Sequence, residues 1–235
     1  MKYILAKIKN KIFPRLMSSD DFICILKKKN INIGKGTYFF SPATTIVDTQ
    51  RPELIEIGEY CKITAGVKIL AHDYSRSVLR RAYGEIIGEA RKTKIGDNVF
   101  IGMNSIILMG ANIGNNVIIG AGSVVSGNIP DNVVVAGNPA RIVRTLEEHY
   151  QRRKSKSIEE AKEYAKILYN NGITPTVEKM GAFFPIYLKR DIKEIEHYNL
   201  NINLSGDSKD DIISEFLKTE PIYESFDVFL ENLEK

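Results

Sequence analysis

The stretch from Ile95 to Val125 repeats every six residues, and this period constrains the fold more than any other feature. An aliphatic residue opens each block, a glycine follows it in four of the five blocks, and the fifth position is small or β-branched throughout. A period of six fits neither a helix nor a simple alternating strand. It fits a coil with three flat faces, each face one short strand and one tight turn. The opening residue is predicted to point inward and stack on its equivalents, while Gly, Asn and Asp allow the corner conformations.

The same pattern predicts how far the coil extends. It begins at Ile31, is degenerate over residues 38–52, recovers at Ile57 and runs to about Val135. Pro139 cannot continue a central strand ladder, so the coil is expected to close there.

Residues 73–94 interrupt the repeat and carry several charges. Insertions in repeat folds collect on one face, often the binding face. His72 stands directly before this insertion, and an imidazole can exchange a proton near neutral pH, so we expect His72 to be functional. His149 and His197 lie in charged, helical surroundings and are interpreted as surface histidines.

Residues 1–30 are predicted to be helical. Ile4, Ile8 and Ile12 recur at four-residue spacing among lysines. Such a stripe either lies on an anionic membrane or packs on the rest of the protein, here across the open end of the coil. Ser19 is expected to start a second short helix, whose acids come first and lysines last, as the helix dipole favours.

Residues 146–235 are predicted to form a mostly helical appendage that packs on the coil or on a neighbouring subunit. Thr145 opens a short helix, and a capping box at 157–160 starts another that ends at Gly172. Two more helices are predicted near 207–218 and 225–233.

The bulk composition limits the partners and the compartment. The formal net charge of +4 suits an anionic small molecule or a membrane surface but is too weak to indicate nucleic acid. The two cysteines are far apart, which fits a reduced compartment, and no apolar run is long enough to span a bilayer. Lysines interrupt any signal-peptide core at the N-terminus. We therefore expect a cytoplasmic protein, with residues 1–30 as the candidate for peripheral contact with the inner face of the membrane.

Residues 95–144, including the closing GNPAR-x-x-R, resemble the hexapeptide-repeat acyltransferases of the maltose and galactoside acetyltransferase type. That group includes the capsule and lipopolysaccharide sugar O-acetyltransferases. The resemblance covers about 31–145 and implies a mainly β fold, a left-handed parallel β-helix with an N-terminal helical segment and a mostly helical C-terminal appendage. It also implies acetyl-CoA as co-substrate, no metal, a carbohydrate acceptor, and a homotrimer with active sites between subunits. Outward residues such as Val99, Ile106 and Val117 would need cover in that assembly.

The resemblance also implies a catalytic role for His72. In this family a single histidine, just before a loop that leaves the coil, is the general base for direct transfer from acetyl-CoA to a hydroxyl. A backbone N–H on the neighbouring coil would stabilise the oxyanion. Asp73, Asp48 or a backbone carbonyl would orient the imidazole.

Further positions match coenzyme contacts of the family. An aromatic side chain and two backbone positions would lie along the pantetheine arm, and a Ser–Gly pair near the phosphates, where a Lys often stands in relatives. A proline would lie near the adenine, beside two arginines, whose paired donors suit phosphates. In that order these residues are Phe100, Met103, Ala121, Ser126, Gly127, Pro139, Arg141 and Arg144.

The function expected from these features is O-acetylation of a sugar in a cell-surface polysaccharide or its precursor, with the acceptor decided by residues 73–94. N-acetylation of an amino-sugar nucleotide, or acetylation of an antibiotic, is the alternative enzyme activity. A trimeric scaffold with a partner-binding C-terminal module is the alternative without catalysis. A carbonic anhydrase built on this coil would need three histidines per zinc, and His72 is the only one in the coil.

Overall fold

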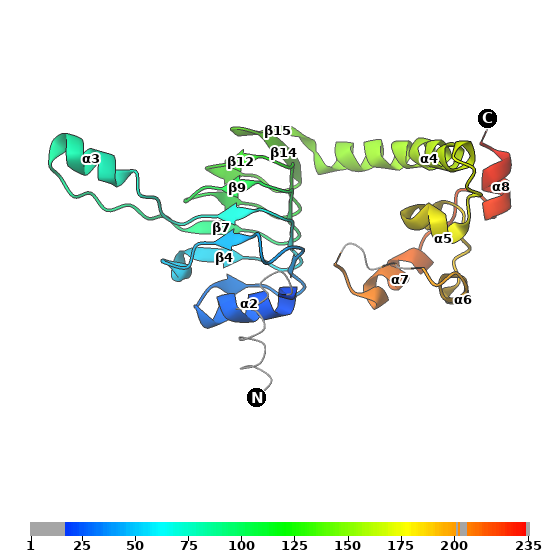
Figure 1. Cartoon of the computed structure of the whole chain (residues 1–235), viewed down its shortest axis with the longest axis horizontal. Helices are drawn as coiled ribbons and strands as arrows, with labels where there is room; N and C mark the ends of the chain where they lie inside the picture. Colours follow the sequence, from blue (N-terminus) through cyan, green and yellow to red (C-terminus); the bar gives the residue numbers. More distant parts are fainter. Residues whose placement is uncertain (1–16, 201, 203–205, 234–235) are drawn as a thin grey trace. The chain divides into compact units, whose positions relative to one another are not determined.

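The computed structural model describes residues 17–200, 202 and 206–233 (Figure 1). The chain divides into two compact units, with the boundary between His149 and Tyr150. The first unit contains the hexapeptide repeat and the second contains the tail. The stripe predicted at residues 4–12 lies outside the described residues.

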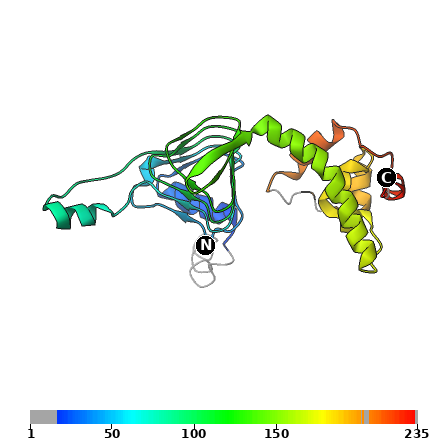
Figure 2. The same cartoon turned by 90° about the horizontal axis from the view of Figure 1, so that it is seen from above.

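The first unit is a left-handed parallel β-helix (Figures 1 and 2). Each turn contributes one strand to each of three sheets, whose orders are β1-β4-β7-β10-β13 (sheet A), β15-β14-β11-β8-β5-β2 (sheet B) and β12-β9-β6-β3 (sheet C). Most strands are two residues long, because each face needs only one inward residue and one outward neighbour. The strands are β1 Asn32–Ile33, β2 Tyr38–Phe39, β3 Ile46–Val47, β4 Ile55–Ile57, β5 Lys62–Ile63, β6 Lys68–Ile69, β7 Thr93–Ile95, β8 Phe100–Ile101, β9 Ile106–Ile107, β10 Asn112–Ile113, β11 Ile118–Ile119, β12 Val124–Val125, β13 Asn128–Ile129, β14 Val133–Gly137 and β15 Ala140–Thr145.

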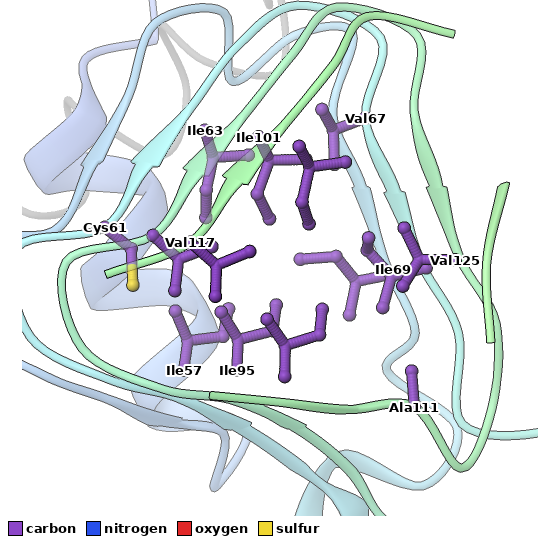
Figure 3. Packing of buried hydrophobic residues seen from close by; sticks show 14 of the residues in the cluster. Ile57, Cys61, Ile63, Val67, Ile69, Ile95, Ile101, Ala111, Val117 and Val125 are labelled. Atoms are coloured by element: carbon purple, nitrogen blue, oxygen red, sulfur yellow. The ribbon is translucent and has the colours of Figure 1, made fainter. Parts of the chain in front are cut away.

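Stacked aliphatic side chains fill the interior of the coil (Figure 3). Ile57 pairs in register with Ile95 in sheet A, and Ile63 with Ile101 in sheet B. These residues are at most 1% exposed. The prediction that the opening residue of each block points inward is confirmed. Burial of such ladders is the main stabilising contribution, since each fully buried aliphatic side chain adds roughly 1.5–3 kcal/mol.

The fifth position of each block is also inside the coil, which the sequence interpretation placed wrongly for two residues. Val99 and Val117 are 1% and 0% exposed, so they need no cover from a neighbour. Figure 3 shows Val117 inside the coil, beside Cys61. These side chains lie where one face turns into the next, and the tight corner explains why only small or β-branched residues occur there. Ile106, by contrast, is partly exposed on the outer face of sheet C.

Asparagines form the corner between sheets A and B. Asn98, Asn116 and Asn132 adopt positive φ values of 53°, 56° and 59°, a conformation that asparagine tolerates better than most residues. The Asn98 amide donates to Asn116 at 2.9 Å, and Asn116 donates to Asn132 at 3.0 Å. The side chains therefore stack as the turns do, and this fixes the spacing of the turns at that corner.

The inserted segment leaves the coil and returns to it at one point. The Arg91 N–H donates to the Ala71 carbonyl at 3.1 Å, and the Thr93 hydroxyl donates to the Leu70 carbonyl at 2.6 Å. The coil therefore continues beneath the insertion without a gap. The segment projects as an arm that carries helix α3, Arg76–Tyr83, which the repeat pattern did not predict (Figure 1).

Both ends of the coil are covered. Helix α2, Ser19–Lys28, forms where a short helix was predicted, and the Ser18 hydroxyl accepts from the Asp21 N–H at its start. Phe22 of this helix packs edge-on against Phe39 of the first turn, with ring centroids 5.0 Å apart. At the other end β15 turns back antiparallel to β14, with Pro139 between them.

The tail begins with one long helix rather than two short ones. Helix α4 runs without a break from Leu146 to Asn170, so the capping box predicted at 157–160 is wrong. Thr145 forms the capping box instead: its N–H donates to the Glu148 carboxylate at 2.8 Å, and its hydroxyl accepts from the Glu148 N–H at 3.1 Å. Local sequence alone marks both sites as possible helix starts, and continuous helical hydrogen bonding overrides the second.

The second unit has its own apolar core, in which Tyr187, Phe216 and Phe229 are buried. Helices form near both of the later predicted positions, while the three between residues 177 and 197 were not predicted. Among the described helices, none is long and apolar enough to cross a membrane. The remaining helical elements are η2 Pro52–Leu54 in the first unit, and α5 Val177–Met180, η3 Gly181–Ile186, α6 Ile192–His197, α7 Lys209–Leu217 and α8 Phe226–Glu231 in the second.

Candidate active site

Successive turns of the coil bring Asp48 and His72 to the same edge, between sheets C and A. Asp48 directly follows β3, and its N–H donates to the carbonyl of Ile69 in β6 at 2.9 Å. His72 follows β6 after two further residues, the second of which, Ala71, is fully buried. Parallel stacking therefore places the imidazole over the carboxylate, at the point where the arm leaves the coil.

The carboxylate of Asp48 contacts the imidazole directly. Its Oδ2 bonds to Nδ1 of His72 and also accepts the Ala71 N–H at 3.1 Å, while Oδ1 accepts the Gln50 N–H at 2.9 Å. Burial disfavours the charged carboxylate, but the hydrogen bonds from the two backbone N–H groups and the imidazole outweigh it and lower the pKa of Asp48. An ionised Asp48 accepts a hydrogen bond from Nδ1–H of His72, which leaves Nε2 unprotonated and able to accept a proton.

Asp73, the other acid proposed to orient His72, is engaged elsewhere. Its Oδ1 accepts the Ser75 N–H at 2.8 Å and the Ser75 hydroxyl at 2.6 Å. These two hydrogen bonds lower the pKa of Asp73 and fix the first turn of the arm. Asp73 therefore shapes the arm, and Asp48 contacts the ring.

A second contact between the same two segments lies beside this pair, and no sequence motif predicts it. The Tyr74 hydroxyl donates to Oε1 of Gln50 at 2.6 Å. The Tyr74 ring stands nearly perpendicular to the His72 ring, with centroids 5.0 Å apart. Gln50 thus helps to hold the Tyr74 ring beside the imidazole of His72.

Three of the predicted coenzyme residues lie together on sheet B and at its edge with sheet C. Phe100 points outward from β8 and is 41% exposed, and Met103 is 53% exposed at the following corner. Ala121 occupies the equivalent corner one turn on, where the Gly122 N–H donates to the Met103 carbonyl at 2.7 Å. These three residues form a column, called the Phe100 column below, that presents exposed apolar side chains and closely packed backbone.

The other predicted coenzyme residues lie in two separate parts of the coil. Arg141 and Arg144 pair with Ala136 and Val134 in the closing hairpin, so they extend sheet B beyond Ala121, and Pro139 lies in the hairpin turn. Ser126 and Gly127 follow β12, at the edge between sheets C and A that also holds His72. One chain therefore carries His72 on one edge of sheet C and the Phe100 column on the other.

Residues 92–127 match the family described as bacterial transferase hexapeptide (six repeats). CapG from Staphylococcus aureus is 39% identical over 166 residues, which cover 71% of this chain and 91% of CapG. This chain belongs to the hexapeptide-repeat transferases. The galactoside O-acetyltransferase of Escherichia coli is 36% identical over 124 residues, 52% of this chain and 58% of that enzyme. A third relative is E. coli WbbJ, which is named as a lipopolysaccharide biosynthesis O-acetyl transferase. It is 48% identical over 56 residues, which cover 24% of this chain and 29% of WbbJ.

The chain is thus an acetyltransferase of the hexapeptide family. A transfer of this kind needs a base for the acceptor and a surface for the acyl donor. In this chain His72, whose Nδ1 contacts Asp48, has the chemistry of such a base. The Phe100 column has the exposed apolar character of such a surface. Among the residues that the structure describes, no cluster of three or more His, Cys, Asp or Glu side chains is arranged to hold a metal ion.

Proposed function

We propose that this acetyltransferase moves an acetyl group from acetyl-CoA to a hydroxyl of a sugar in a cell-surface polysaccharide or its precursor. The observation that carries the proposal is the contact between Asp48 and His72 at the root of the arm. The names of two relatives support a carbohydrate acceptor, since one is a galactoside O-acetyltransferase and the other is named for lipopolysaccharide biosynthesis.

In the proposed reaction His72 acts as general base. Its Nε2 takes the proton of the acceptor hydroxyl while the oxygen attacks the thioester carbonyl of acetyl-CoA. The tetrahedral intermediate then expels the coenzyme thiolate, which recovers that proton from the imidazolium. Asp48 stabilises the imidazolium and holds the tautomer that leaves Nε2 unprotonated. Acetyl passes directly from sulfur to oxygen, with no acetylated side chain between.

The donor is proposed to lie along the column that begins at Phe100. Its exposed apolar side chains suit the pantetheine arm, and Arg141 and Arg144 suit the phosphates. This column and His72 belong to opposite edges of sheet C, so a site that uses both is completed by a second chain. We therefore propose a homotrimer in which His72 of one subunit faces the coenzyme column of the next.

Substitution of His72 tests the mechanism. His72→Ala is expected to lower kcat about 10²–10⁴-fold, the usual contribution of a general base, while acetyl-CoA affinity and assembly stay unchanged. Steady-state assays of coenzyme release, calorimetry with acetyl-CoA and sedimentation would measure the three properties. His197→Ala, at an exposed position on a helix of the second unit, is the matched control. Near-wild-type turnover by His72→Ala would reject the assignment.

An acceptor screen tests the substrate class. Coenzyme release should respond to sugars, sugar nucleotides or surface glycans that carry a free hydroxyl, and product analysis separates O-acetylation from N-acetylation. Saturating acetyl-CoA should also raise the Tm, because a ligand that binds only the native state stabilises it. A noncatalytic scaffold would show neither response.

A further inference from the structure

The arm carries a small, half-open cavity directly after the candidate base. Its volume is about 160 Å³, and it forms where the segment after helix α3 folds back against the start of that helix. Polar and apolar groups share its surface, so it suits a ligand with both an ionic group and a carbon skeleton. The lining residues are Tyr74, Arg76, Ser77, Arg80, Ile86 and Ile87.

Among the residues that the structure describes, two guanidinium groups of this cavity have no carboxylate partner. Arg76 and Arg80 lie four residues apart on α3 and so face the same side of the helix. Within the described part of the chain neither makes an ion pair, whereas Arg153 binds Glu160 at 2.7 Å. The contact found for Arg76 is with the Tyr74 ring, 5.7 Å from the guanidinium carbon. Paired guanidinium groups beside a serine hydroxyl are suited to bind a carboxylate or a phosphate.

Tyr74 connects this cavity to the candidate base. One side of its ring meets the His72 ring at 5.0 Å between centroids, and Tyr74 also lines the cavity. An acid group held by the two arginines would therefore bring the rest of a small ligand toward the imidazole. A single monosaccharide can carry both an acid group and the hydroxyl to be acetylated.

We propose that the cavity lined by Arg76 and Arg80, the arginine cavity, binds the acid group of an acidic saccharide. This group is either the carboxylate of a uronic acid or the phosphate of a glycosyl phosphate, so the cavity selects an anionic acceptor. This inference rests on the proposed function, because it assigns an acceptor to the site of His72. The arm thus supplies charge recognition, while the coil supplies the base. Asp73 is an ionised carboxylate at the start of the arm, and the two guanidinium groups outnumber its single negative charge.

The test is saccharide binding by the full chain in the absence of acetyl-CoA, measured by calorimetry. Glucuronic acid and glucose 1-phosphate are the acidic probes, and glucose is the neutral one. Wild-type protein should bind at least one acid about tenfold more tightly than glucose, as expected for charge-assisted hydrogen bonds at a partly exposed site. The preferred acid tells a carboxylate from a phosphate acceptor. Arg76→Gln with Arg80→Gln should abolish the preference.

Arg81→Gln is the matched control, because Arg81 lies on the same helix but not on the cavity surface. It should keep the preference for the acid. A wild-type protein that binds neither acid more tightly than glucose would overturn the proposal, as would a double variant that retains the preference. The His72→Ala protein should bind the acids as wild type does. Binding thus tests the cavity, and turnover separately tests the role of His72.

Discussion

Asp48 contacts Nδ1 of His72 across 24 residues of sequence, and the β-helix brings the two groups together. Each belongs to the same edge of consecutive turns, and the Asp48 side chain is almost fully buried there. The carboxylate also accepts hydrogen bonds from two backbone N–H groups, so its position is fixed independently of the imidazole. The pair is therefore preorganised by the scaffold rather than by a flexible loop.

Asp48→Asn should lower kcat about 100-fold or more and leave the KM for acetyl-CoA unchanged. If the introduced amide turns its NH₂ group toward Nδ1 of His72, the imidazole carries its proton on Nε2. In that tautomer Nε2 can no longer act as the base. Steady-state kinetics at neutral pH would measure both constants. Asp73→Asn is the control, since that carboxylate binds Ser75 rather than the ring. Equal losses in the two variants would argue against a specific role for Asp48.

The ionised state of Asp48 should also stabilise the fold in a pH-dependent way. Its pKa is lowered in the native protein, because hydrogen bonds outweigh the burial that opposes ionisation. The stabilisation is complete above the unfolded pKa, near 3.9, and is lost as the pH falls through the lower folded pKa. Wild type should therefore exceed Asp48→Asn in unfolding free energy by about 1–2 kcal/mol at neutral pH. Denaturant titrations from pH 7 to acid should find this gap shrinking below about pH 4, and a gap that widens would contradict the prediction.

Tyr74→Phe should reduce kcat about 3–10-fold, the size expected from one net hydrogen bond. The variant keeps the ring against His72 but loses the bond to Gln50, so the imidazole is less well restrained. Tyr74→Ala, which removes the ring as well, should lose more. Turnover of both is compared with Tyr83→Phe, an exposed tyrosine on the same arm. Equal activity of Tyr74→Phe and Tyr83→Phe would show that the Gln50 contact does not serve catalysis.

Gly102→Ala should destabilise the coil by about 1–3 kcal/mol, the usual effect of overpacking. A Cβ there would lie 2.5 Å from the backbone N of Ala121 on the next turn, so the turns would have to separate. The same shift would disturb Met103, and the rise in Tm with acetyl-CoA should become smaller. Gly88→Ala on the arm is the control, since its Cβ would meet nothing within 4 Å. Thermal unfolding with and without acetyl-CoA measures both effects.

Three features of the structure differ from the sequence-based predictions for specific physical reasons. Val99 and Val117 do not stand outward from the flat faces as expected, because the tight corner returns the chain to the interior. A second helix start was predicted at Ser157, where the hydrogen bonds of α4 in fact continue. Helix α3 was missed because the arm has no hexapeptide pattern, and its cavity exists only after the arm folds back on itself.

The sequence by itself determined the β-helix, the inward aliphatic ladders and the break after His72. A six-residue spacing of aliphatic residues can bury one continuous core in only this kind of coil, so local pattern and global fold agree. Only the tertiary structure decided that Asp48, rather than Asp73, meets the imidazole. Asp48 lies in the degenerate part of the repeat, and its distance to His72 depends on how each turn closes rather than on the residues between them. The arginine cavity likewise depends on the fold of the arm, because no repeat fixes where those side chains point.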